Sequence, residues 1–146
     1  MRIMVDANIA VSAILFPKSV VAKIFNHLIE NHNLVLSKYT IDEIEDVFNE
    51  KFPHRITEMK EFMKKTPYEL FVLNKFDKKK YPNIRDIDDL PVLANAIEAK
   101  VDLLITGDKD FDGVKIEKTK IMKPRKYMDE YMVGAGVSGT ETWQQR

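Results

Sequence analysis

The chain of 146 residues contains no cysteine, which excludes thiol catalysis, thiolate-bound zinc and disulfide bonds. No apolar run approaches the roughly 20 residues that a membrane-spanning helix needs. The first residues enter a strand-like run at once, which leaves no room for a signal peptide. We therefore expect a cytoplasmic protein without a membrane attachment.

An excess of charge of one sign is also missing. Lys plus Arg and Asp plus Glu number 23 each, so a uniformly basic nucleic-acid binder is not indicated. The sequence has no glycine-rich phosphate loop and no serine nucleophile motif, and its three histidines lack ligand spacing. What remains is an ordinary globular balance, 45% hydrophobic and 32% charged, in a chain long enough for one domain with its own core.

Strand-like and helical segments alternate along the chain. Short apolar runs predict strands at residues 2–6, 34–37, 69–73, 102–106 and 120–122. Helical spacing of apolar residues fills the intervals, at residues 8–16, 20–29, 40–52, 54–65, 90–100 and 124–131. This alternation predicts an α/β fold with parallel strands joined by right-handed crossovers.

The last residues differ in kind. Residues 133–146 hold Gly134, Gly136 and Gly139 together with Ser and Thr, and they show no apolar periodicity. We expect one domain over residues 1–132 and a flexible tail over residues 133–146, to which we assign no catalytic role.

Four acidic residues lie where a parallel sheet would gather them. Asp6 closes the first strand and Asp108 follows the fourth, while Glu43 and Asp89 each open a helical pattern. Ligands in open α/β sheets bind beyond the carboxyl ends of the strands. Carboxylates brought together there repel one another unless a cation joins them, and hard oxygen ligands suit Mg²⁺ or Mn²⁺. The pattern therefore predicts a metal-dependent phosphodiester hydrolase.

Two of these acids have an alternative reading as helix caps. Asp6 precedes a helix, where Asp is a favoured N-cap, although an ionised group at the end of a central strand needs compensation. Thr40 and Glu43 form a capping-box pattern, with Glu at the third helical position. If Glu43 serves as a cap, Asp42 and Glu45 are the alternative ligands.

A second group of acids crowds the start of the helix at residues 90–100. Asp86, Asp88 and Asp89 precede Pro91, a residue favoured in the first turn, so we expect one of them to be a cap. Asp89 is the predicted metal ligand, because Leu93 four residues on places it in line with the buried helix face.

The segment Thr106-Gly107-Asp108-Lys109-Asp110-Phe111 follows the fourth strand, and its composition is typical of a turn. Asp108 and Asp110, at alternate positions beside the Thr106 hydroxyl, can also bind a hydrated cation. We expect Phe111 to anchor this loop in the core.

Taken together, these segments resemble the PIN-domain family of metal-dependent ribonucleases. They look most similar to its VapC-like members, the toxin components of prokaryotic toxin–antitoxin systems. The resemblance covers about residues 1–132. The segments that carry it are Val5-Asp6-Ala7-Asn8, Glu43, Asp89-Leu90-Pro91-Val92-Leu93-Ala94-Asn95-Ala96, Thr106-Gly107-Asp108-Lys109-Asp110-Phe111 and Ile121-Met122-Lys123-Pro124-Arg125-Lys126-Tyr127-Met128.

The resemblance implies a three-layer α/β/α fold with a parallel five-stranded sheet. It also implies a Mg²⁺- or Mn²⁺-dependent endoribonuclease that hydrolyses RNA with metal-activated water, with a cognate antitoxin as partner and a homodimer as its assembly. The implied catalytic residues are Asp6, Glu43, Asp89 and Asp108, the metal ligands Asp6, Asp89, Asp108 and Asp110, and the supporting polar residues Asn8 and Thr106. We expect Arg85 and Lys79 to contact substrate phosphates.

A phosphoacceptor receiver domain is the alternative from another class. That fold also binds Mg²⁺ with acids after its first strand, and it uses a Thr and a Lys-Pro that Thr106 and Lys123-Pro124 would supply. It needs an acceptor Asp after its third strand, however, and here Leu73 is followed by Asn74. A PIN fold that only binds a partner is the other alternative, and the complete acidic quartet argues against it.

Overall fold

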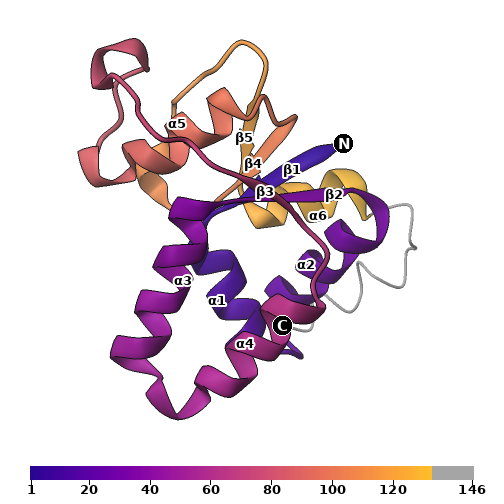
Figure 1. Ribbon diagram of the computed structural model, residues 1–146. Helices are drawn as coiled ribbons and strands as arrows, with labels where there is room; N and C mark the ends of the chain where they lie inside the picture. The colour runs from indigo at the N-terminus through magenta and orange to yellow at the C-terminus, as the bar shows by residue number, and fades with distance from the viewer. Residues whose placement is uncertain (133–146) are drawn as a thin grey trace.

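The computed structural model describes residues 1–132, so the expected tail at residues 133–146 lies outside the described residues. Its centre is a parallel sheet in the order β3-β2-β1-β4-β5 (Figure 1). The strands are β1 (Arg2–Val5), β2 (Asn33–Ser37), β3 (Glu69–Phe71), β4 (Leu103–Ile105) and β5 (Lys120–Met122). The predicted parallel five-stranded sheet is therefore confirmed.

The strand order decides between two fold families that the sequence left open. The chain runs outward from β1 to β2 and β3, then returns to the other side of β1 with β4 and β5. Receiver-type folds have the order 2-1-3-4-5 instead, so the receiver alternative is wrong. The reversal lies between β1 and β4, and ligand crevices form at the carboxyl ends of such neighbouring strands.

Helices cover both faces of the sheet, which confirms the three layers. They are α1 (Ala7–Leu15), α2 (Val20–Asn31), α3 (Lys38–Lys51), α4 (Ile56–Lys65), α5 (Leu90–Glu98) and α6 (Pro124–Tyr131), with 3₁₀ turns η1 (Pro53–Arg55), η2 (Lys78–Lys80), η3 (Ile87–Asp89) and η4 (Lys109–Phe111). Alternate residues of β1 point to opposite faces. Ile3 and Val5 join the core under α1, α2, α3, α4 and α6, while Met4 joins the core under α5.

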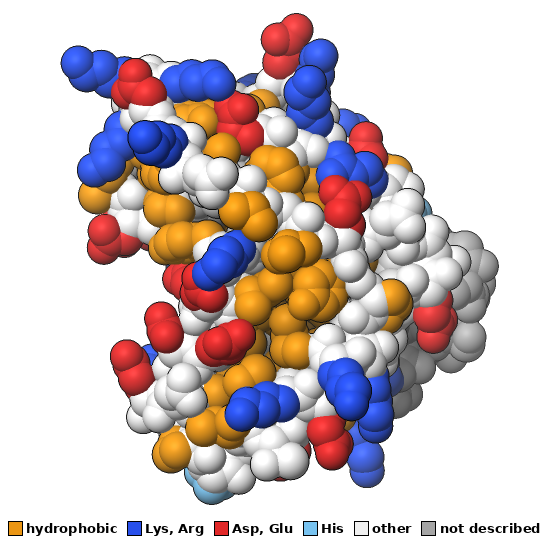
Figure 2. Space-filling model, viewed as in Figure 1, with side chains coloured by type: hydrophobic (Ala, Val, Ile, Leu, Met, Phe, Trp, Pro, Cys, Tyr) orange, Lys and Arg blue, Asp and Glu red, His pale blue; other side chains and the backbone are white. Residues whose placement is uncertain are grey.

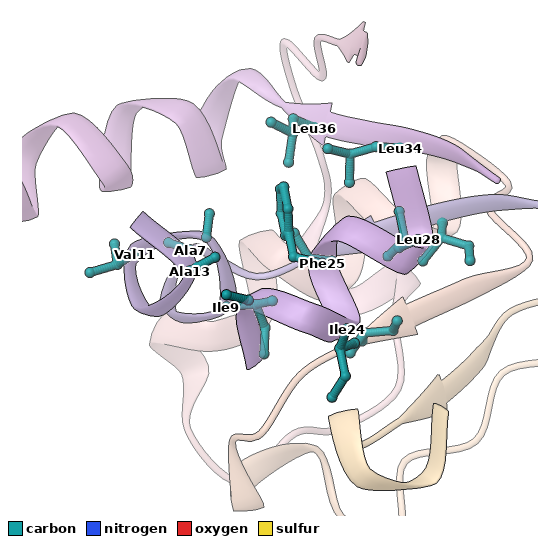
Figure 3. Close-up of a cluster of buried hydrophobic side chains, with 14 of the residues drawn as sticks. Ala7, Ile9, Val11, Ala13, Ile24, Phe25, Leu28, Leu34 and Leu36 are labelled. Carbon is teal, nitrogen blue, oxygen red and sulfur yellow. The ribbon is translucent and has the colours of Figure 1, made fainter. Parts of the chain in front are cut away.

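The larger core is organised around α2. Phe25 and Leu28 are almost fully buried, and Phe25 points from α2 toward Leu34 and Leu36 of β2 (Figure 3). Each such side chain contributes about 1.5–3 kcal/mol by leaving water. This packing holds the α1–α2 layer against the sheet and thereby fixes the loop that leads from β1 into α1.

The helix starts show which polar residues serve as caps. Ser19 caps α2, with its hydroxyl accepting from the Ala22 N–H at 3.1 Å. The expected capping box at Thr40 and Glu43 is wrong, because α3 begins earlier, with Ser37 as its N-cap. The Ser37 hydroxyl accepts from the Thr40 N–H at 3.0 Å, and the buried Thr40 hydroxyl has no hydrogen-bond partner among the described residues.

The remaining differences from prediction lie at segment ends. The helix predicted to reach Lys100 ends at Glu98, because Lys100 adopts a left-handed conformation with φ of 56°. The strand predicted to reach Leu73 ends at Phe71, and the polar segment that follows contains η2 and η3. The ends of helices and strands depend on single hydrogen bonds, which cannot be predicted from apolar periodicity.

Among residues 1–132, no single helix combines the length and the apolar composition of a membrane span. The pair α1 and α2, bent by 111°, reaches them only when taken together, by length and composition. Both helices contribute buried residues to the core described above.

The observed cap makes a prediction about stability. Replacing Ser37 with Ala should lower the free energy of unfolding by about 1 kcal/mol, because the Thr40 N–H loses its acceptor. Glu43→Ala should not lower it, since Glu43 lies beyond the capped turn, and Ala, unlike Gln, cannot fill a capping box. Urea denaturation of both variants measures the difference, with Ser19→Ala as a second true cap. A loss in Glu43→Ala as large as that in Ser37→Ala would restore the capping-box interpretation.

Candidate active site

The acidic residues meet at the carboxyl edge of the sheet. Asp6 follows β1, Asp108 follows β4, Asp89 immediately precedes α5, and Glu43 lies one turn inside α3. We call the space that these four residues border the acidic hollow. Figure 2 shows a hollow at the left of the molecule, between α3 and the lobe of η2, η3 and α5, with acidic side chains along its border.

Asp6 is held in place from two directions. It is only 7% exposed, and one carboxylate oxygen accepts from the Ile9 N–H at 3.2 Å, so Asp6 also caps α1. The other oxygen accepts from the hydroxyl of Thr106, which is itself buried. Burial raises the pKa of Asp6, while the hydrogen bonds from Thr106 and Ile9 oppose this and the charge of Asp108 adds to it. The cap and the site therefore share one carboxylate.

Thr106 connects Asp6 to the next acid along β4. Its hydroxyl oxygen accepts from the Asp108 N–H at 3.1 Å, and Asp108 in turn accepts from the Asp110 N–H at 2.9 Å. Phe111 ends η4 and is buried against α5, as expected for the anchor of this loop. The segment can therefore be both a turn and part of the site, because the hydrogen bonds of the turn orient both acids.

Asp89 has the most strongly raised pKa of these acids. Burial raises its pKa to about 7, with further contributions from the charge of Asp108 and from contacts with Asp110 and Asp108. Its Oδ2 atom is buried and has no hydrogen-bond partner among the described residues. Asp89 occupies the N-cap position of α5, but its side chain makes no capping hydrogen bond, so the cap expected on this helix is not formed. Asp86 instead caps η3, where it accepts from the Asp88 N–H at 2.9 Å.

Asp86 is a further acid of this group, and the sequence had not led us to assign it to the site. Asp86, Asp89 and Asp110 offer carboxylate oxygens that all lie within 4.8 Å of one another. The available signal was the spacing of Asp86 and Asp89. Three residues make one turn of a 3₁₀ helix, so η3 aligns the two side chains.

Glu43 completes the wall on the α3 side. It is partly buried, and burial raises its pKa, followed by the charges of Asp6 and Asp46. The contribution of Asp6 is consistent with a position of Glu43 on the wall that faces Asp6. The cluster of three oxygens within 4.8 Å contains neither Glu43 nor Asp6 and Asp108, two of the predicted metal ligands.

The expected supporting residue Asn8 and the basic residues Lys79 and Arg85 have fewer contacts with the acidic hollow. Asn8 is exposed, and its main-chain N–H helps to lower the pKa of Asp6. Lys79 and Arg85 are exposed on the segment between β3 and α5. Among residues 1–132, no hydrogen bond or ion pair joins either of them to the acidic hollow.

The residues present fit a divalent cation. The donor set consists of carboxylate oxygens, which suit Mg²⁺ or Mn²⁺. The buried Oδ2 of Asp89 lacks a donor, an arrangement that costs free energy unless a cation or a proton compensates it. A cation bound there would remove both the missing contact and the mutual repulsion of the acids.

Comparisons with known proteins agree on the fold. A family model described as PIN domain matches residues 2–110, a span that contains all the acids above. One chain of VapBC2 from Rickettsia felis, in a complex bound to a DNA fragment from its promoter, is similar with a TM-score of 0.66 and 18% identity. That match covers 84% of this chain and 98% of that chain. No curated protein matches the sequence.

The raised pKa of Asp89 predicts how stability depends on pH without metal. An Asp whose folded pKa is about 7, above its unfolded value near 3.9, favours folding only while it is protonated. This contribution is complete below pH about 4 and is lost as the pH rises to about 7. In EDTA, Asp89→Asn should therefore gain stability relative to the wild type across that range.

Urea denaturation at several pH values tests this dependence. Asp88→Asn, which removes an exposed charge from the same turn, is the matched control and should run parallel to the wild type. If the wild type and Asp89→Asn keep a constant difference from pH 4 to 8, the Asp89 carboxyl is not perturbed as described.

Proposed function

The chain belongs to the PIN-domain family, and from that premise we propose that it is a metal-dependent endoribonuclease and the toxin of a toxin–antitoxin pair. The observation that carries the proposal is the convergence of Asp6, Asp89 and Asp108 at the β1–β4 switch, with an unpartnered oxygen on Asp89. Acids that gather at a ligand crevice and form no ion pair within residues 1–132 support a cation-binding catalytic site.

Each acid has a distinct part in the proposed reaction. Thr106 and the α1 N-terminus fix both oxygens of Asp6, so this carboxylate is oriented before a ligand arrives. Asp89 is assigned as a cation ligand together with Asp86 and Asp110, whose carboxylate oxygens lie within 4.8 Å of its own, and Asp108 is assigned as a further ligand. Because the pKa of Asp89 is about 7, cation binding near neutral pH displaces a proton from this group.

A Mg²⁺ or Mn²⁺ held by these acids would supply an activated water and would neutralise the charge that develops on the phosphate oxygens. Glu43, on the opposite wall, is assigned to positioning the attacking water. Cysteine is absent, so a thiol intermediate is excluded. Attack by water does not require the 2′-hydroxyl, and the products should carry 5′-phosphate and 3′-hydroxyl ends.

Unpaired RNA is the proposed substrate. A single strand can bend its backbone into a recessed acidic site, which a duplex does not do without melting. Lys79 and Arg85 on the neighbouring lobe are assigned to flanking phosphates, since both are exposed. Contacts of this kind add affinity without reading sequence.

The proposed partner is a small antitoxin, in a cytoplasmic complex that also contains a second copy of the chain. The similar Rickettsia felis structure is a VapBC2 assembly on promoter DNA, which supports a partner of that type here. Acids without cationic partners attract Lys or Arg side chains as well as metal ions. We propose that an antitoxin segment inserts such a side chain into the acidic hollow.

We predict that the purified protein cleaves single-stranded or looped RNA with Mg²⁺ or Mn²⁺ and that EDTA abolishes the cleavage. Asp6→Asn should remove nearly all activity. Thr106→Val should lower kcat/KM by about 10–100-fold, because it releases Asp6 and the Asp108 N–H together. Product ends and rates are measured by gel electrophoresis of labelled RNA, with and without phosphatase.

Asp129→Asn, which alters an exposed acid on α6, is the control and should retain full activity. Cleavage that survives EDTA, or 2′,3′-cyclic phosphate ends, would refute the mechanism. Equal cleavage by Asp6→Asn would indicate a contaminating nuclease. A protein that binds its partner but never cleaves RNA would support the binding-module alternative.

The partner proposal makes a separate prediction. A small protein encoded beside this chain should co-purify with it, and Mn²⁺ binding measured by titration calorimetry should be weaker in the complex than in the free chain. Replacing the partner's inserted cationic residue with Met should restore Mn²⁺ binding. Normal growth of the native host during overexpression of this chain alone would count against the toxin role.

A further inference from the structure

Tyr39 occupies an unusual position relative to the rest of its helix. The buried residues of α3, among them Ile44 and Phe48, belong to the core below the sheet. Tyr39, in the first turn, instead packs against the core on the α5 side. Since β2 ends at Ser37, the Tyr39 ring must pass over the carboxyl edge of the sheet to reach that core.

This path takes the ring along the acidic hollow. Tyr39 precedes Glu43 by four residues, so the two side chains lie on the same side of α3. Burial raises the pKa of the Tyr39 phenol, and the charges of Glu43, Asp89 and Asp88 raise it further. Those charges belong to residues on both walls, α3 and η3.

The Tyr39 hydroxyl has no structural task within the described residues. A buried tyrosine usually finds a partner for its hydroxyl. Tyr81 donates to Glu98 at 3.1 Å, and the Tyr127 hydroxyl lies 2.8 Å from a His27 ring nitrogen. For Tyr39, none of the hydrogen bonds found in residues 1–132 involves the hydroxyl, and the side chain is only partly buried.

We propose that Tyr39 stacks on the nucleobase next to the scissile phosphate and thereby selects unpaired nucleotides. The inference rests on the proposed function, because it assigns a substrate contact to the same site. Nucleobases stack on aromatic rings through their π-faces, an interaction that tolerates any base. A base inside a duplex already stacks on its neighbours, so only an unpaired nucleotide can use this ring.

The position of the ring also solves a problem of charge. The acidic hollow repels the phosphates of a nucleic acid until a cation is bound. A neutral aromatic ring at its border attracts the base without adding charge of either sign. Tyr39 therefore binds the nucleotide through its base, while the acids bind the cation and position the water.

The test pairs a Tyr39 variant with RNA that lacks one base. A labelled single-stranded RNA with one cleavage site is prepared intact and as a series with one abasic nucleotide at each position in turn. Dissociation constants are measured by fluorescence anisotropy in Ca²⁺, and KM and kcat are measured separately in Mn²⁺. Wild type, Tyr39→Leu, Tyr39→Phe and Tyr68→Leu are compared.

For the wild type, removing the base beside the cleavage site should weaken binding about tenfold. Tyr39→Leu should lose about tenfold on intact RNA, mainly in Kd and KM, and nothing further on that abasic RNA. Tyr39→Phe should bind like the wild type because the ring remains. Tyr68, a partly buried tyrosine between α3 and α4, is the matched control and should have no effect.

Equal losses for Tyr39→Leu on intact and abasic RNA would overturn the inference, as would unchanged binding in this variant. Thermal unfolding of each variant separates a folding defect from a lost contact, and a defect in Tyr39→Leu leaves Tyr39→Ile to repeat the comparison. Cleavage without discrimination of the abasic site would leave the nuclease proposal intact and remove only the role of Tyr39. Base-dependent binding without cleavage would do the opposite. If the wild type binds no RNA, both proposals fail.

Discussion

The hydrogen bond between the Thr106 hydroxyl and the Asp6 carboxylate is the contact on which the candidate site depends. It joins the ends of β1 and β4, the two strands at the switch in the sheet. The same carboxylate caps α1, and the same hydroxyl accepts from the Asp108 N–H. A single buried pair thus fixes the exit of one strand, the start of a helix and the turn that presents the next acid.

Around this fixed pair, the acids are held in an arrangement that disfavours their charged forms. Burial raises the pKa of Asp6, Glu43 and Asp89, and neighbouring carboxylates add to the effect in each case. The fold tolerates this repulsion because the packing of α2, α5 and Phe111 stabilises the elements that carry the acids. Free energy stored in this way becomes available for binding a cation.

The two walls of the acidic hollow differ in construction. On the β1–β4 wall, Asp6 and Thr106 are buried and Asp108 is partly buried, and main-chain and hydroxyl groups orient these acids. The α3 wall presents Glu43 and Tyr39 from the first turns of one helix, whose start is set by Ser37. A shift of that start by one residue would rotate both side chains by about 100° around the helix axis. The Ser37 cap therefore influences the site, although none of the hydrogen bonds found in residues 1–132 joins its side chain to an acid.

Local patterns in the sequence determined the elements and the positions of most acids. Apolar periodicity predicted the parallel α/β fold, and β5 and α6 begin and end where the sequence predicted. Asp6 and Asp108 could be predicted at strand ends, because each follows its apolar run directly in the sequence. The resemblance to PIN domains gave these four acids their expected catalytic roles and added the three layers.

Only the tertiary structure decided the contacts between distant residues. Asp6 and Thr106 are separated by 100 positions in the sequence. No local sequence pattern indicates that β4 pairs with β1 rather than with β3. Ser37 replaced Thr40 as the cap, and Asp86 joined Asp89 and Asp110, because backbone geometry at a segment end is settled by packing. Periodicity reports which face of an element is buried, whereas long-range packing selects the groups that meet there.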